Sequence, residues 1–171
     1  MLLKDKNLNK NDDFLGKLWH LEQLKSEIEK RKQEGKVIVL ANGCFDILHV
    51  GHIRYLREAK YNGDLLVVAI NSDESTRVLK GEERPFIPET ERLQIISELI
   101  SVDYILIFEE LNVSKILLDI KPHFHAKGTD YTLDSVPEKD TVESYGGKIL
   151  ICGDPKNHSS TELGKILKES N

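Results

Sequence analysis

Short apolar runs of strand length alternate with longer amphipathic segments along most of this 171-residue chain. Five such runs cover residues 37–41, 65–70, 104–108, 123–127 and 148–152; four contain β-branched residues, and 123–127 is short and polar at its end. Continuous apolar character over so few residues is typical of strands that are covered on both faces. Because strands that alternate with helices form parallel sheets, the pattern predicts an α/β fold. We expect a five-stranded parallel sheet with helices on both faces, in three α/β/α layers.

The amphipathic segments between these runs supply the helices of the predicted fold. They cover residues 51–62, 89–100, 113–120, 138–145 and 160–168. A further apolar stripe, which includes Phe14, Leu18 and Leu24, predicts a helix over 13–34 that ends before Gly35. We therefore divide the chain into an N-terminal tail with an amphipathic helix (1–35) and a single domain (36–171). The apolar stripe can pack either on the core or on a partner subunit.

The composition is that of a globular chain, and it narrows the classes of partner. Hydrophobic residues make up 39% and charged residues 31%, and the formal net charge of -5 argues against charge-driven binding to nucleic acid. Two cysteines, Cys44 and Cys152, are too few for a disulfide framework, which fits a reducing compartment. We find no apolar run of membrane-spanning length and no signal-peptide pattern, so we expect a cytoplasmic protein that does not enter a membrane.

The segment that follows the first predicted strand carries an unusual set of polar residues. It reads Asn-Gly-Cys-Phe-Asp-Ile-Leu-His-Val-Gly-His over residues 42–52 and leads into a predicted helix. In open parallel sheets, ligands bind beyond the carboxyl ends of the strands, and a helix N-terminus at that edge attracts anions. His49 and His52 add imidazole donors to the turn, while Gly43 and Gly51 allow a ligand to approach the backbone. The segment therefore predicts a site for phosphate groups.

Simpler interpretations of these residues remain open. A single histidine at a helix start is commonly a cap or a surface residue, and Gly43 can belong to an ordinary turn. Zinc is another interpretation of His49 and His52, but no further Cys or His with metal-site spacing lies nearby in the sequence. The complete run between a buried strand and an amphipathic helix favours the phosphate site.

The run from Gly43 to His52 resembles the signature of the HIGH-type nucleotidyltransferase superfamily, in its cytidylyltransferase-like branch. Within that branch the chain is similar to the adenylyltransferase domains of ADP-heptose synthases. Besides residues 42–49, the shared motifs are Asn71-Ser72-Asp73, Lys80-Gly81 followed by Arg84-Pro85, Pro88 with Arg92, and Lys127-Gly128-Thr129-Asp130-Tyr131. The likeness runs from about Val37 to Leu167 and implies a Rossmann-like fold.

The resemblance also implies roles for individual residues. His49, His52, Lys80 and Arg92 are the implied catalytic residues, with Lys80 in a loop over 79–88 that closes over the nucleotide. The implied nucleotide-binding residues are Gly43, Cys44, Phe45, Gly51, Asn71, Asp73, Lys127, Gly128, Asp130, Ser159, Ser160 and Thr161. Asp46 is a weak candidate for a metal ligand. Taken singly, Lys80 and Arg92 are typical surface residues, Asp130 is typical of an Asx turn, and the Ser-Ser-Thr run is typical of a helix N-cap.

The implied reaction is the transfer of AMP from ATP to D-glycero-β-D-manno-heptose 1-phosphate, which yields ADP-heptose and pyrophosphate for lipopolysaccharide core or another surface glycan. A sugar phosphate has a second pKa of about 6, so it is already an anionic nucleophile at pH 7 and no general base is required. Mg²⁺ is expected with ATP, held through phosphates and water. The resemblance further implies a homodimer and a separate upstream sugar kinase, because the larger bifunctional relatives carry a kinase domain for which this chain has no room.

Two other functions stay open. His158 and Glu162 flank the Ser-Ser-Thr run, where relatives tend to carry smaller or different residues, and residues 153–157 lack the arginine that some relatives place there. Base choice is therefore the least determined feature, and cytidylyl transfer to glycerol 3-phosphate or a similar phospho-alcohol is the alternative reaction. A nucleotide-binding module without catalysis is the third alternative, since the sheet, the glycine turn and the helix dipole suffice for binding.

Overall fold

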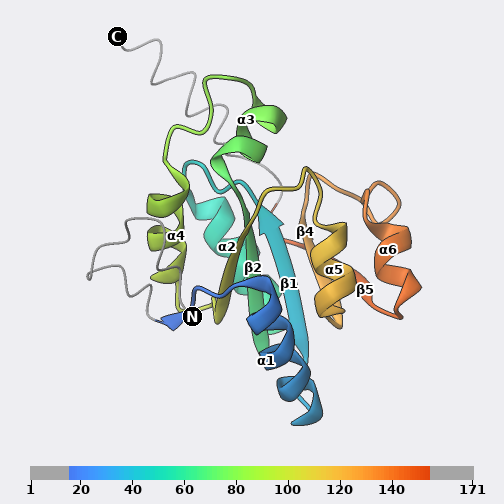
Figure 1. Ribbon diagram of the computed structural model, residues 1–171. Helices are drawn as coiled ribbons and strands as arrows, with labels where there is room; N and C mark the ends of the chain where they lie inside the picture. The colour runs from blue at the N-terminus through green and yellow to red at the C-terminus, as the bar shows by residue number, and fades with distance from the viewer. Residues whose placement is uncertain (1–15, 155–171) are drawn as a thin grey trace.

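Five parallel strands form one sheet in the computed structural model, which describes residues 16–154 (Figure 1). The strands are β1 (Ile38–Gly43), β2 (Leu65–Asn71), β3 (Tyr104–Phe108), β4 (Phe124–Gly128) and β5 (Lys148–Cys152). Their order is β3-β2-β1-β4-β5, and every neighbouring pair is parallel. The predicted five-stranded parallel sheet is confirmed.

Helices cover both faces of this sheet. They are α1 (Leu21–Gln33), α2 (Val50–Tyr61), α3 (Asp73–Lys80), α4 (Glu89–Ser97), α5 (Ser114–Ile120) and α6 (Lys139–Ser144). Buried residues of α2 and α4 pack with one face, and those of α1, α5 and α6 pack with the other. The three-layer α/β/α arrangement is therefore confirmed. The remaining helix, α3, follows the carboxyl end of β2 and lies beyond the ends of the strands (Figure 1).

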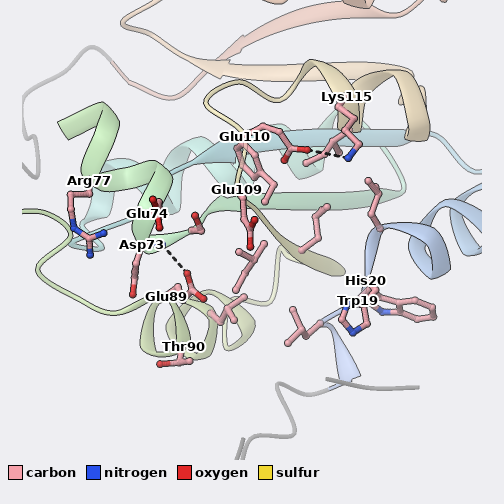
Figure 2. A pocket seen from close by; sticks show the side chains of 18 residues that line it. Trp19, His20, Asp73, Glu74, Arg77, Glu89, Thr90, Glu109, Glu110 and Lys115 are labelled. Carbon is pink, nitrogen blue, oxygen red and sulfur yellow. Dashed lines mark hydrogen bonds and ion pairs between the residues drawn. The ribbon is translucent and has the colours of Figure 1, made fainter. Parts of the chain in front are cut away.

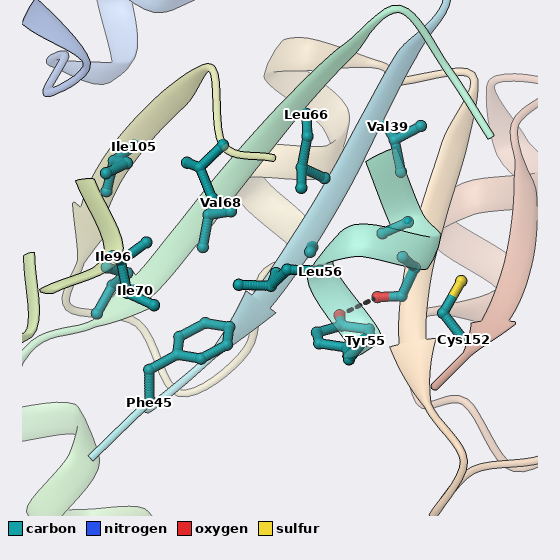
Figure 3. Packing of buried hydrophobic residues seen from close by; sticks show 14 of the residues in the cluster. Val39, Phe45, Tyr55, Leu56, Leu66, Val68, Ile70, Ile96, Ile105 and Cys152 are labelled. Carbon is teal, nitrogen blue, oxygen red and sulfur yellow. Dashed lines mark hydrogen bonds between the residues drawn. The ribbon is translucent and has the colours of Figure 1, made fainter. Parts of the chain in front are cut away.

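Successive residues of the central strand point into different layers. Val39 belongs to one hydrophobic cluster and Leu40 to the other, and both are fully buried. Figure 3 shows the first cluster, where the Tyr55 hydroxyl of α2 donates a hydrogen bond to the Ala126 carbonyl of β4 at 2.8 Å. Because both faces of the sheet are covered, the strands are mostly apolar instead of alternating, and β4 is the exception, since it contains His125 and Lys127.

The strand order places a topological switch point beside β1. The chain passes from β1 to β2 and β3 in one direction, and then returns to the other side of β1 with β4 and β5. Ligands of such sheets bind outside the carboxyl ends at the point where the order reverses. That point lies between Gly43, at the end of β1, and Gly128, at the end of β4.

The first helix starts later than predicted. α1 begins at Leu21, and Leu18, which was expected inside the helix, forms a parallel bridge with Ile105 of β3. The Trp19 N–H donates to the Ile105 carbonyl at 2.9 Å, so this segment satisfies backbone groups of an edge strand. The predicted helix start was wrong because the helical pattern of apolar residues does not show that an edge strand needs a partner. Phe14 lies outside the described residues.

The apolar stripe of α1 packs on the core of the same chain. Leu24 and Ile28 are fully buried in the second hydrophobic cluster, beside residues of the sheet. This settles one of the two alternatives left open for the stripe, while the division of the chain at residue 35 stays a prediction. Within residues 16–154, no helix is both long enough and apolar enough to cross a bilayer.

Helix α3 was not predicted. Ser72 is its N-cap, and the Ser72 Oγ accepts a hydrogen bond from the Ser75 N–H at 3.1 Å. The cap was the available signal, since a segment with few apolar residues shows no helical stripe. Lys80, which was expected in a loop, is the last residue of α3, and the loop begins at Gly81. The helix α4 also ends early, at Ser97, and leaves Ile100 outside it; the predicted helix over 160–168 lies beyond the described residues.

Candidate functional site

The N-terminus of α2 lies at the switch point and carries both histidines of the motif. His49 is the N-cap residue, and His52 lies in the first turn, which contains no acidic side chain. The two rings stack with centroids 3.9 Å apart and an interplanar angle of 27°, and both residues are half-buried. The first backbone N–H groups of a helix and the positive end of its dipole favour an anion at this position. The turn is therefore suited to bind phosphate.

A contact within the turn orients His52. The backbone N–H of His49 donates to Nδ1 of His52 at 3.4 Å, and the Phe45 ring meets the His52 ring edge-on, with centroids 5.3 Å apart. A neutral imidazole that accepts at Nδ1 carries its proton on Nε2. The arrangement therefore gives His52 an Nε2–H group of the kind that donates to a phosphate oxygen.

Two glycines make room for side chains of the site itself. A Cβ atom at Gly51 would lie 2.9 Å from the His49 ring, and one at Gly43 would lie 3.2 Å from the Phe45 ring. A side chain at either position would require the neighbouring ring to shift, so packing favours glycine at both. Their expected second role, the close approach of a ligand to the backbone, stays a prediction.

Lys127 supplies a cation from the other side of the switch point. It is 6% exposed, its Nζ lies 3.1 Å from the Glu138 carboxylate, and the Tyr131 ring centroid is 4.8 Å from Nζ. Gly128 follows, where a Cβ atom would come within 2.7 Å of the Asp130 carboxylate. The structure thus places Lys127, Gly128 and Asp130 together at the ligand edge of β4, where the motif predicted them.

Asn42 and His125 join β1 to β4 beside this lysine. The Asn42 Oδ1 lies 3.1 Å from Nε2 of His125 and 3.4 Å from Nζ of Lys127. Burial, and to a lesser extent the Lys127 ammonium, lower the pKa of His125 to about 3. His125 is therefore neutral at physiological pH, and its Nε2–H can donate to the Asn42 amide oxygen.

Arg92 lies beneath the surface of the site. Its side chain is fully buried and donates to the carbonyl oxygens of Ile87 (2.9 Å), Cys44 (2.5 Å) and Asn71 (2.8 Å), and to the Asp73 carboxylate (2.8 Å). These bonds join the carboxyl ends of β1 and β2 to the starts of α3 and α4. A direct phosphate contact by Arg92 would require some of the bonds to break, and it stays a prediction.

Cys44, Asn71 and Asp73, which were predicted to bind the nucleotide, gather around Arg92. The Cys44 Sγ lies 3.8 Å from the Asn71 Oδ1, and the Asp73 backbone N–H donates to the Glu89 carboxylate at 2.8 Å. The structure therefore brings these three residues together through contacts within the protein, and their contacts with a nucleotide stay predictions. Lys80 is exposed at the end of α3.

Asp46 faces the loop that connects α3 to α4. It is 2% exposed, and its carboxylate accepts hydrogen bonds from the Phe86 and Ile87 N–H groups and pairs with Arg84. In the part of the chain that the structure describes, no group of three or more His, Cys, Asp or Glu side chains is arranged to hold a metal ion. A metal role for Asp46 stays a prediction. Ser159, Ser160 and Thr161 lie outside the described residues.

A cavity of about 910 Å³ opens elsewhere on the carboxyl edge, beside the ends of β2 and β3 (Figure 2). Its acidic lining residues are Asp73, Glu74, Glu89, Glu109 and Glu110, and its basic ones are Arg77 and Lys115. The Lys115 ammonium is paired with Glu110 at 3.2 Å. A triphosphate would meet a surplus of negative charge here. The volume of this cavity therefore does not make it the phosphate site.

Sequence reasoning missed Asn42, Arg84 and Glu138 as residues that hold the site. Asn42 and Arg84 belong to motifs that the sequence analysis recognised, but the residues that they contact could not be predicted from those motifs. Glu138 is the N-cap residue of α6 and lies outside every motif. No local pattern marks it, because its partner Lys127 belongs to a strand.

The fold, with two histidines at its switch point, puts this protein in the nucleotidyltransferase class. Comparison with known families agrees, since a model described as cytidylyltransferase-like matches residues 40–165. The chain belongs to the cytidylyltransferase-like family.

Curated relatives confirm the narrower resemblance. The bifunctional protein HldE of Geobacter metallireducens is 45% identical over 159 residues, which are 92% of this chain and 32% of that protein. The bifunctional protein HldE of Pelobacter propionicus is 48% identical over 136 residues, which are 80% of this chain and 28% of that protein. The chain thus spans about a third of the length of these relatives.

Solved structures share the architecture. The lipopolysaccharide core biosynthesis protein of Thermoplasma volcanium matches with a TM-score of 0.62 and 34% identity, over 71% of this chain and 99% of that one. The pantoate-beta-alanine ligase of Francisella tularensis matches with a TM-score of 0.61 and 18% identity, over 89% of this chain and 77% of that one. The second likeness shows the fold alone.

Proposed function

We propose that this chain transfers AMP from ATP to D-glycero-β-D-manno-heptose 1-phosphate, with release of ADP-heptose and pyrophosphate. The observation that carries the proposal is the stacked His49–His52 pair at the start of α2, in a chain that is 45% identical to a bifunctional protein HldE over 92% of its length. The similarity to a lipopolysaccharide core biosynthesis protein supports a product used for lipopolysaccharide core or another surface glycan.

The proposed reaction is an in-line displacement at the α-phosphorus of ATP. A phosphate oxygen of the sugar 1-phosphate forms the new P–O bond, the bond from the α-phosphorus to the α,β-bridging oxygen breaks, and pyrophosphate leaves with that electron pair. The second pKa of a sugar phosphate is about 6, so the nucleophile is already ionised at neutral pH. Catalysis then depends on positioning the reactants and on stabilising the charge that develops on the transferred group.

The side chains at the switch point fit these two tasks. His49 and His52, with the first N–H groups of α2, would donate to the α-phosphate as its charge increases. Lys127 would place a positive charge across the switch point from them, and Lys80 would reach the phosphates from the end of α3. Arg92 would not contact the substrate in this arrangement but would hold the ends of β1 and β2 in position through its hydrogen bonds to Cys44 and Asn71.

Mg²⁺ is proposed to enter as the complex with ATP, coordinated by phosphate oxygens and water, because this cation keeps most of its own hydration shell. We also propose that a separate sugar kinase supplies the sugar 1-phosphate and that the chain works as a homodimer in the cytoplasm. Sedimentation velocity at micromolar concentration tests the dimer, and a single species of monomer mass would contradict it.

A matrix of nucleotides against acceptors tests the reaction. ATP and CTP are each combined with heptose 1-phosphate and with glycerol 3-phosphate, and released pyrophosphate is measured. We expect the largest signal from ATP with the heptose 1-phosphate. A signal confined to CTP with glycerol 3-phosphate would replace the proposal by the cytidylyltransferase alternative, and nucleotide binding without pyrophosphate in any combination would favour a non-catalytic module.

A further inference from the structure

Asp46 and Glu138 are the two buried acidic residues within residues 16–154, and both oxygens of Asp46 contact one loop. Asp46 is 2% exposed, and its Oδ1 accepts hydrogen bonds from the Phe86 N–H (2.7 Å) and the Ile87 N–H (3.0 Å). Oδ2 lies 3.0 Å from Nη1 of Arg84. Three contacts thus join the turn after β1 to residues 84–87, about forty positions further along the chain.

The loop side of this junction is itself braced. The Arg84 guanidinium lies over the Phe86 ring, 4.2 Å from its centroid, and its side chain is only 10% exposed. The Ile87 carbonyl accepts from Nε of Arg92, whose Nη1 also binds the Cys44 carbonyl. The loop is therefore tied to the residue two positions before Asp46 as well as to Asp46 itself.

Phe45 lies between these two tethered positions and contacts the ring of His52. Its φ of 49° is a left-handed conformation that bulky residues rarely adopt, so the surrounding contacts must hold it. Its ring covers Gly43 and meets the His52 ring edge-on, at a centroid distance of 5.3 Å. A change at Asp46 that lets Phe45 relax would therefore move the ring against which His52 packs.

We propose that Asp46 is a positioning residue, which anchors the loop over 84–87 to the turn after β1 and, through Phe45, fixes the imidazole of His52. The inference rests on the proposed function for its catalytic consequence. The sequence predicted a loop over 79–88 that closes freely over the nucleotide, whereas these contacts hold part of that loop in place. The half of the loop next to α4 is pinned at Asp46, and only its start, near Gly81, is outside these bonds.

The test compares Asp46→Asn, Arg84→Gln and the double variant Asp46→Asn/Arg84→Gln. Asn keeps the size of Asp46 and one acceptor for the amides, but it leaves the buried Arg84 charge unbalanced. We expect each single variant to lower kcat for pyrophosphate release by roughly 10- to 100-fold, as for a displacement of about 1 Å, with a smaller change in the KM for ATP. The double variant should lose no more than Asp46→Asn alone, because both changes remove the same contact. Glu82→Gln is the matched control, since it removes a carboxylate from an exposed position in the same loop and should leave kcat unchanged.

A second readout does not depend on activity. Amide hydrogen exchange at Phe86 and Ile87 should be slow in the wild-type chain and faster by at least roughly tenfold in Asp46→Asn, because an anionic acceptor forms the stronger bond. If Asp46→Asn does not fold, kcat and amide exchange are both measured on Arg84→Gln instead.

Several outcomes would overturn the inference. One is a kcat equal to that of the wild type in either single variant. Another is a loss of kcat in the double variant that equals the two single losses combined. A third is fast hydrogen exchange of the Phe86 and Ile87 amides in the wild-type chain. A Mg²⁺ requirement raised tenfold in Asp46→Asn, with none of the loss in Arg84→Gln, would make Asp46 a metal ligand instead. Absence of pyrophosphate from the wild-type chain would remove the proposed function but not the anchor, which the exchange measurement still decides.

Discussion

The two halves of the carboxyl edge of the sheet differ in charge and in what their polar groups bind. At the ends of β1 and β4, the His49 and His52 rings stack at the start of a helix, with the buried Lys127 on the neighbouring strand. Beside β2 and β3, five acidic side chains and two basic ones line a cavity of about 910 Å³. We call the first region the histidine half and the second the acidic half; the side chains that are predicted to donate to phosphate lie in the histidine half.

On this sheet, the predicted phosphate site coincides with the donor groups and the cation and not with the acidic cavity. An ATP molecule carries several negative charges, so an acidic wall lowers its local concentration while a helix N-terminus and a cation raise it. The histidine half should therefore govern turnover. The acidic half should tolerate substitution, except at Asp73, whose carboxylate accepts from Arg92, and at Arg92 itself, whose bonds reach both halves.

Replacing one histidine in each half by alanine should give the largest difference in turnover. His52→Ala should lower turnover by roughly 100- to 1000-fold, because it removes a donor to the group that gains charge in the transition state, while nucleotide binding stays partly intact. His20→Ala is the control, since His20 is exposed and lines the acidic cavity. Pyrophosphate release measures turnover, and an unchanged rate in His52→Ala would exclude the residue from the mechanism.

Arg92 tests whether the two halves are held together as one unit. Arg92→Lys should lower the free energy of unfolding by about 3 kcal/mol, because a single ammonium cannot reach the four acceptors that the buried guanidinium binds. Urea denaturation measures the change. Arg77→Lys, on the wall of the cavity, should alter stability by less than about 0.5 kcal/mol, and equal losses in the two variants would contradict this account.

Two lysines extend the comparison to cations. Lys127→Met should lower kcat/KM for ATP by about 10- to 100-fold, the equivalent of losing one charged hydrogen bond of about 1.5–3 kcal/mol. Lys115→Met should have no effect, because Lys115 is 66% exposed and pairs with Glu110 beside the cavity. The companion variant Lys127→Met/Glu138→Gln removes the carboxylate that would otherwise be buried without its partner. If that variant recovers full activity, the effect of Lys127→Met belongs to folding and not to phosphate binding.

One contribution to the pH dependence of stability should originate in the histidine half, at His125. Because the pKa of His125 falls from 6.5 in the unfolded chain to about 3 in the fold, protonation favours the unfolded state as the pH drops below 6.5. This one group should remove about 2 kcal/mol of stability between pH 7 and pH 5, and none above pH 7. Urea denaturation at both pH values should show a smaller difference for His125→Gln than for the wild type. His20→Gln should keep the wild-type difference, and the same slope in all three chains would contradict the assignment.

Much of the fold was accessible to sequence reasoning because its signals are local. Runs such as residues 65–70 are apolar throughout, and their length excludes most helices, so all five strands were found. The errors occur where a distant partner decides the conformation. Leu18 leaves the helical pattern to pair with Ile105, and the short helix α3 depends on the Ser72 cap more than on an apolar stripe.

The site divides in the same way. The turn over 42–52 was identifiable because its histidines and glycines lie within a few residues of one another and next to a helix start. Arg92 and Asp46 were identified as site residues, but their burial and partners were not. Asp46 contacts residues 84–87, and Arg92 contacts Cys44 and Asn71. These partners are too far apart in the sequence for a periodic pattern to predict them.

Sequence alone therefore determined the class of fold, the edge of the sheet at which the site is predicted and the turn that carries two imidazoles. Each of these follows from short-range patterns of apolar and special residues. Tertiary structure decided which charges are paired inside the protein and which are available to a ligand. The reason is physical: the cost of burying a charge depends on whether chain closure brings an opposite charge or a carbonyl group to it, and that partner can come from anywhere in the sequence.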